Sequence, residues 1–65
     1  MLQKNDLVEY TQLEMFDKTL EGRRGLFQES FIKPFLSGEE NYSTVLFFGI
    51  GFKDVPTICL SKVNN

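Results

Sequence analysis

The chain contains no histidine, no tryptophan and only one cysteine. Without histidine it lacks the commonest general base and the commonest metal-ligating side chain, and one thiol cannot form an internal disulfide. No residue pattern indicates a nucleophile, a metal centre or a cofactor site, so we expect no cofactor and a protein that is not an enzyme. Cys59, between Ile58 and Leu60, is expected to be a buried and unreactive thiol.

Long apolar segments and an excess of basic residues are also absent. The longest uncharged stretch, residues 41–52, is too short to cross a bilayer, and no apolar run follows a basic N-terminus. We therefore expect no membrane contact and a location in the cytoplasm or within a larger particle. The net charge of −2 argues against nucleic acid as a partner.

The aromatic content is high for so short a chain: seven phenylalanines and two tyrosines among 65 residues. This length predicts one small domain, residues 1–65, with a marginal core that no disulfide or metal reinforces. Nine rings are difficult to bury in such a domain, and aromatic residues dominate association surfaces. We therefore expect a homo-oligomer, and the chain is either a whole domain or a truncated unit that other chains complete.

The clearest secondary-structure signal is the apolar alternation over residues 44–52, which predicts a strand. Both faces of this strand are apolar, so it is either buried on two sides or packed against another subunit. The face with Phe48 and Phe52 is expected to be strongly buried, alone or at an interface, and the face with Phe47 is expected in a subunit interface. The predicted core and interface residues are Leu46, Phe47, Phe48, Phe52 and Leu60.

A turn over residues 53–56 and a second strand over residues 57–63 complete a predicted antiparallel hairpin. Upstream, residues 6–21 fit a helix with a capping box of Asp6 and Glu9, or a short helix or loose arm followed by a strand near residues 14–20. The fold class is therefore mainly β or small α+β, an antiparallel hairpin or sandwich-like unit with a short N-terminal helix or arm. The remaining segments are predicted as a turn (residues 22–25), a short helix or irregular segment (26–33) and a polar loop (37–41).

The spacing of the apolar residues, one proline and one serine over residues 46–61 resembles the central hairpin of the H-type lectin family. The residues that carry the resemblance are Leu46, Phe48, Phe52, Pro56, Ile58, Leu60 and Ser61. It implies an antiparallel β-sandwich that assembles as trimers or hexamers and binds N-acetylgalactosamine-type sugars, with related modules in bacteriophage tail adhesins. The later strands of that family, which hold its arginine and aromatic sugar contacts, have no counterpart here. The resemblance therefore assigns no sugar-binding residue.

Two functional hypotheses follow. The first is a non-enzymatic carbohydrate-binding or adhesin-like assembly module, in which polar loops such as residues 23–25 and 37–41 meet a glycan. The second is a small inhibitor or regulator that docks on a partner protein through its acidic N-terminal part. Arg23 and Arg24 are either a solvated turn or a contact for an acidic or hydroxyl-rich ligand.

Overall fold

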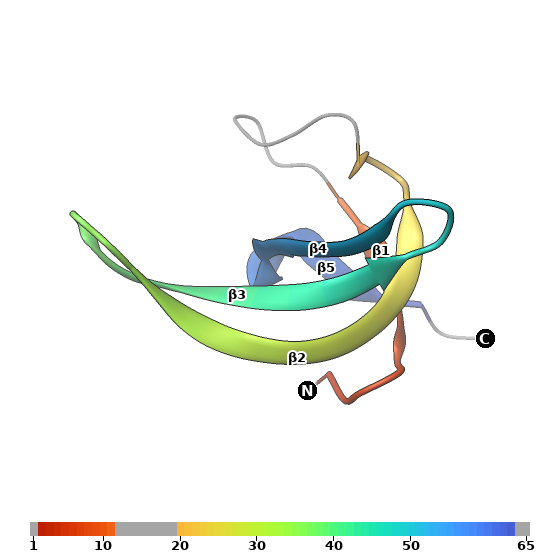
Figure 1. The fold of residues 1–65 in the computed structure, drawn as a ribbon, viewed down its shortest axis with the longest axis horizontal. Helices are drawn as coiled ribbons and strands as arrows, with labels where there is room; N and C mark the ends of the chain where they lie inside the picture. The colour runs from red at the N-terminus through yellow and green to blue at the C-terminus, as the bar shows by residue number, and fades with distance from the viewer. Residues whose placement is uncertain (1, 12–19, 64–65) are drawn as a thin grey trace.

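The computed structural model describes residues 2–11 and 20–63, which form one antiparallel sheet (Figure 1). The strand order is β4-β3-β2-β1-β5, so the first strand pairs with the last. The fold is mainly β, as the sequence predicts. No helix in the described ranges is long and apolar enough to span a membrane. The strands are β1 (Leu7–Tyr10), β2 (Arg24–Phe35), β3 (Gly38–Phe47), β4 (Gly51–Pro56) and β5 (Leu60–Lys62).

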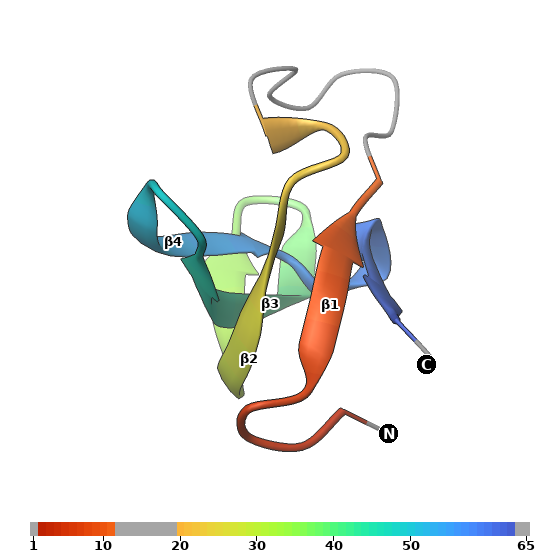
Figure 2. The same ribbon diagram turned by 90° about the vertical axis from the view of Figure 1, so that its right-hand side faces the viewer.

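The sheet is strongly curved because its two edge strands are consecutive in the chain. Strands β4 and β5 lie at opposite ends of the strand order, yet only a 3-10 turn, η2 (Thr57–Cys59), joins them. Three residues can bridge the two edges only if the sheet curls and brings them together, as Figures 1 and 2 show. The side chains on the inner face of this curl form the core.

The core collects apolar side chains from four strands, η2 and the segment before β2. The Tyr10 and Phe47 rings meet edge to face at its centre, with centroids 6.3 Å apart. Strand β3 supplies every second residue to the inner face, as a pleated strand must. The buried apolar residues are Val8, Tyr10, Leu20, Phe27, Val45, Phe47, Val55 and Cys59.

Within the single chain, the core forms on the face of β3 that was expected in a subunit interface. Phe47 is 1% exposed and belongs to the core, whereas Phe48 and Phe52 are 52% and 65% exposed on the outer side. Alternation predicted the strand, but both of its faces are apolar, so the pattern carried no information about which face turns inwards. Leu46, on the outer face with Phe52, is only half-buried.

The predicted hairpin of residues 44–52 and 57–63 is also wrong, because the chain turns earlier. Gly49 and Gly51 adopt φ angles of 77° and 109°, which favour glycine, and they place the turn between β3 and β4 at residues 48–50. Residues 53–56 are therefore strand rather than turn. The predicted second strand divides into η2 and β5, and β5 pairs with β1.

Strands β2 and β3 continue beyond the rest of the sheet as a two-stranded hairpin, which we call the arm (residues 29–41). Strand β1 pairs with β2 only as far as Leu26, and β4 reaches β3 only as far as Tyr42. The predictions of a helix or irregular segment at residues 26–33 and of a loop at residues 37–41 are therefore wrong, because residues 26–33 and most of residues 37–41 are strand. Phenylalanines at a spacing of four fit a strand face as well as a helix face.

The N-terminal segment forms a strand where a helix is one of the two predictions. Leu7–Tyr10 is β1, and Asp6 accepts the amide of Gln3 at 2.8 Å instead of capping a helix. The strand predicted near residues 14–20 lies outside the described residues apart from Leu20, which is buried. The predicted turn at residues 22–25 is confined to residues 21–22, because β2 begins at Arg24.

Candidate functional site

A pocket of about 480 Å³ opens beside the inner face of the sheet, next to η2. Its volume lies within the range of roughly 300–1,000 Å³ that is typical of small-molecule sites. Half of the lining is apolar and half is polar, and none of it is charged. The lining residues are Leu2, Phe27, Ser30, Asn41, Thr57 and Leu60.

A chain of hydrogen bonds fixes the polar wall of this pocket. The Thr57 hydroxyl donates to Asn41 Oδ1, which uses its only proton. The hydroxyl of Ser43, 2.7 Å from that of Thr57, must therefore be the donor in their contact. The chain runs from Ser43 through Thr57 to Asn41, and each bond polarises the next.

The direction of this chain determines what Asn41 offers to the pocket. Asn41 Oδ1 accepts the bond from Thr57, so the two N–H donors of the Asn41 amide take no part in this chain of bonds. No described residue accepts them. Ser30 adds a hydroxyl that both donates and accepts. The pocket therefore suits a ligand with hydroxyl or carbonyl oxygens.

Ser43 is fully buried, and apart from the hydroxyl of Tyr10 and the thiol of Cys59 no other side chain with a polar group is buried to this degree among the described residues. An unsatisfied hydroxyl in such a position costs about 1–3 kcal/mol, so its bond to Thr57 is needed for the fold to tolerate it. An alanine or valine would fill the site without this requirement. The serine therefore serves to orient Thr57 and, through it, Asn41.

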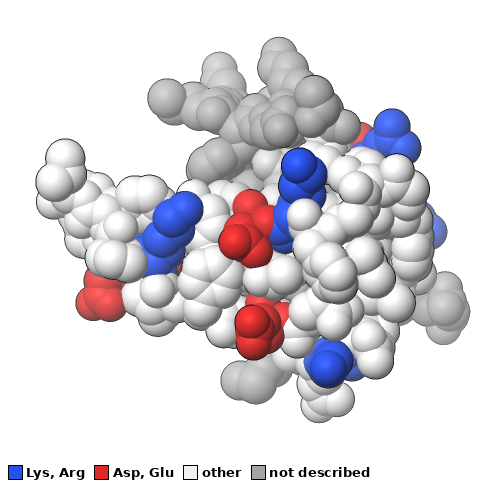
Figure 3. Space-filling model, viewed as in Figure 1, with Lys and Arg blue, Asp and Glu red and all other residues white. Residues whose placement is uncertain are grey.

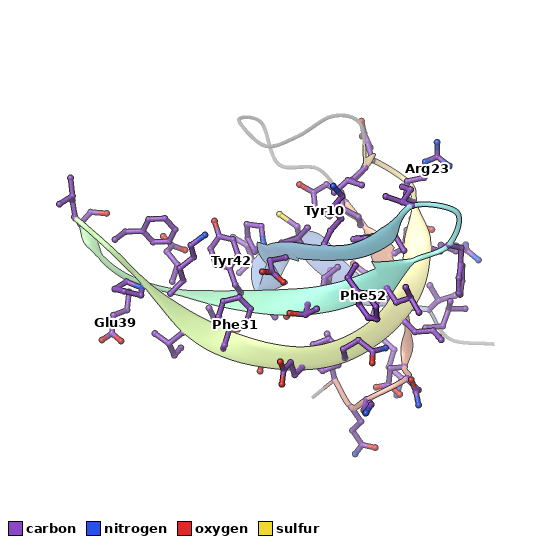
Figure 4. All side chains as sticks on the ribbon, in the orientation of Figure 1. Tyr10, Arg23, Phe31, Glu39, Tyr42 and Phe52 are labelled. Carbon is purple, nitrogen blue, oxygen red and sulfur yellow. The ribbon has the colours of Figure 1, made fainter. Side chains whose placement is uncertain are left out.

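A smaller depression of about 250 Å³ lies beside the arm, lined by Phe35, Ser37, Glu40, Tyr42 and Pro56. Tyr42 is the centre of a three-ring cluster, with ring centroids 6.2 Å from Phe31 and 5.8 Å from Phe35 (Figure 4). Lys33 Nζ lies 5.0 Å from the Tyr42 centroid, within range of a cation–π interaction. The tip of the arm, residues 34–38, carries no charged side chain and is white at the left of Figure 3.

The predicted core and interface residues do not form one site. Phe47 lies in the core, Phe48 and Phe52 lie on the outer face, and Leu60 lines the inner pocket. Cys59 is buried, as expected, but it lies in η2 rather than in the middle of a strand. Among the described residues, no group of His, Cys, Asp and Glu side chains is placed to hold a metal ion.

The basic pair predicted as a turn or a ligand contact separates in the structure. Arg23 is exposed, whereas Arg24 begins β2 and its Nε donates to Glu9 Oε1 at 2.9 Å. Glu9 in β1 lies directly opposite Arg24 in β2, so this ion pair reinforces the sheet. Arg24 is therefore engaged within the chain.

The hydrogen-bonded residues of the inner pocket are not among those predicted from the sequence. Asn41 falls at the end of a stretch predicted as a loop, and Thr57 follows a proline predicted as part of a turn. Ser43 did carry a signal: it stands two residues before Val45 and therefore on the buried face of β3. A polar residue on a buried face is informative, but this signal depends on a correct assignment of the face.

Comparisons with known proteins add no further constraint. No protein-family model, curated protein or solved structure matches this chain. The resemblance to H-type lectins therefore stays a prediction.

Proposed function

We propose that the protein is a non-enzymatic binding module that holds a neutral, hydroxyl-bearing ligand, a carbohydrate residue, in the inner pocket. The observation that carries this proposal is the hydrogen-bond chain from buried Ser43 to Asn41, which leaves the two amide donors of a residue lining the pocket of about 480 Å³ without an acceptor among the described residues. The apolar floor formed by Phe27 and Leu60 supports the same ligand class, because a sugar ring combines apolar C–H faces with hydroxyl groups. An adhesin-like role in assembly follows from the same activity.

Substitution of Asn41 by aspartate tests the proposal with little change in shape. Asn41→Asp keeps an oxygen for Thr57 but replaces both N–H donors with a charged acceptor. We expect a glycan found by array screening to lose about tenfold or more in affinity, because its oxygens would face a carboxylate. Binding would be measured by NMR titration of the intact chain, with perturbed resonances expected at Ser30, Thr57 and Leu60.

Asn5→Asp is the matched control, since it makes the same chemical change at an exposed position that does not line the pocket. Asn5 has a φ of 71°, a conformation that aspartate also tolerates. Equal loss of binding in the two variants would contradict the proposal. So would a glycan panel in which no sugar perturbs the pocket resonances.

A second candidate is docking on a partner protein through the arm, and the exposure of its tip favours it. Leu36 is fully exposed, and Ile32 and Phe35 are more than one-third exposed. Large apolar side chains exposed along a projecting hairpin are typical of a contact surface. Co-purification of one stoichiometric protein that is lost in Leu36→Ser but kept in Asn41→Asp would favour this candidate over the first.

A further inference from the structure

The β2 side of the arm is an open sheet edge. Strand β1 and the residues before it cover β2 as far as Phe27, whose carbonyl accepts the amide of Asn5. Beyond that point, β3 is the only strand that pairs with β2 in the described part of the chain. An open edge presents unpaired backbone donors and acceptors that can pair with another strand.

The alternation of the ladder determines which backbone groups face this edge. The Phe48 amide donates to the Arg24 carbonyl at 3.0 Å, so the backbone groups of Phe48 face β2. In an antiparallel ladder every second residue faces the same neighbour, so every second residue of β3 down to Tyr42 also turns its backbone groups towards β2. Tyr42 lies opposite Phe31, so the backbone groups of Phe31 point towards β3. The residues on either side of Phe31 therefore turn their backbone groups towards the open edge.

Those outward residues are Ser30 and Ile32, each with one N–H and one C=O group. The next outward position is occupied by Pro34, which has no N–H group. Proline within a sheet is confined to such edge positions, where no neighbouring strand needs the donor. The usable edge is thus short and centred on Phe31.

We propose that this edge pairs antiparallel with the same edge of a second copy of the chain, with Phe31 opposite its own counterpart. In this register Ser30 lies opposite Ile32 at two symmetric positions. Both residues turn their backbone groups outwards, so each pair exchanges two N–H···O=C bonds. The two Phe31 residues then form the closer, non-hydrogen-bonded pair between them, as the parity of an antiparallel ladder requires.

Charge complementarity favours a second copy as the occupant and also selects this register. Glu29 and Lys33 lie two residues on either side of Phe31, on the same face of β2. A two-fold axis at Phe31 therefore sets Glu29 of each copy opposite Lys33 of the other. No ion pair joins Glu29 to a described residue, so its carboxylate is available for this contact.

Shifted registers lose these contacts. Moving the second copy so that Ile32 faces its own counterpart would place Pro34 opposite Ser30 and remove one N–H donor from each such pair. The same shift would separate Glu29 from Lys33. Only the register centred on Phe31 combines opposite charges, paired aromatic rings and a full set of backbone partners.

The aromatic cluster of the arm gives this association an apolar component. Phe31, Phe35 and Tyr42 already contact one another within one chain. Pairing at Phe31 would bring the clusters of the two copies together on one face of the joined sheet. Only two hydrogen-bonded residue pairs and the aromatic clusters meet in this contact, so we expect a weak dimer whose population rises with concentration.

Sedimentation velocity of the intact chain over a concentration series, from about 10 μM to 1 mM, tests the proposal. Glu29→Lys and Lys33→Glu each convert two opposite-charge contacts into two like-charge contacts. We expect either change to raise the dimer dissociation constant about tenfold. The double variant, with both charges exchanged, restores the pairs and should return the constant to within about threefold of the parent's.

Glu39→Lys is the matched control, because it makes the same charge change on the β3 side of the arm. It should leave the dissociation constant within about threefold of the parent's, and circular dichroism checks that every variant remains folded. A monomer throughout the concentration range would overturn the proposal. A dimer that responds equally to Glu39→Lys, or that the double variant does not restore, would also overturn it.

Discussion

The same two strands, β2 and β3, behave differently in the two halves of the molecule. In the body, where β1 or β4 flanks them, alternate residues such as Phe27, Val45 and Phe47 are fully or almost fully buried. In the arm every residue is exposed except Phe31, which is half-buried. The apolar side chains of the body are explained by the core that they fill. Those of the arm are not, and this difference is the physical basis for assigning contacts with other molecules to the arm.

The polar residues follow the same division. Charged side chains in the arm are exposed to solvent, whereas the hydrogen-bond chain from Ser43 to Asn41 begins in the core and ends at the base of the arm. The inner pocket therefore lies where rigid body and projecting arm meet. A site at this position combines oriented side chains with open access to solvent.

The largest expected effect is a difference in stability between the alanine variants of two neighbouring phenylalanines, Phe47 and Phe48. Phe47→Ala removes a fully buried ring and should cost about 3–5 kcal/mol, which is comparable to the whole stability of about 3–10 kcal/mol for a chain of this length. Phe48→Ala removes an exposed ring and should cost less than about 1 kcal/mol. Urea unfolding followed by circular dichroism measures both values. Similar losses for the two variants would show that the faces of β3 are assigned incorrectly.

A smaller difference in stability is expected between the alanine variants of Ser43 and Thr44. Ser43→Ala removes the donor to Thr57 but leaves no unpaired hydroxyl at position 43, so it should cost about 0.5–1.5 kcal/mol. Thr44→Ala removes an exposed hydrogen bond to Asp54 and should cost about 0.5–1 kcal/mol. Chemical denaturation compares the two variants, and the Asn41 side-chain amide resonances should shift only in Ser43→Ala. If the Asn41 resonances do not shift in Ser43→Ala, then Ser43 does not influence the Asn41 side chain in the pocket.

The sequence predicted the strand content better than the arrangement of the strands. Alternation over residues 44–52 correctly located the C-terminal part of β3, residues 44–47, because the period of a half-buried strand is local information. It could not locate the turn, since Pro56 and the glycines at 49 and 51 are all turn-forming residues and only one of these positions is used as a turn. The positive φ of Gly49 is a property of the folded hairpin.

The arm and the pocket were harder to predict for a different reason. Phe27, Phe31 and Phe35 have a spacing that fits both helix and strand, and pairing with β3 decides between them. The pocket depends on contacts among segments far apart in the chain: Leu2, Ser30, Asn41 and Thr57 are brought together only by the curl of the sheet. Such long-range contacts have no local sequence pattern.

The smallest expected effect concerns the tip of the arm. Leu36 is fully exposed in the turn between β2 and β3, so Leu36→Ser exposes no buried surface and removes no contact with the core. We expect the free energy of unfolding to stay within about 0.5 kcal/mol of the parent's, as for surface substitutions in general. Thermal and urea unfolding at low micromolar concentration, where a weak dimer is dissociated, provide the measurement. A loss above about 1 kcal/mol would mean that the tip packs against its own chain, and the arm would then have to be treated as part of the body.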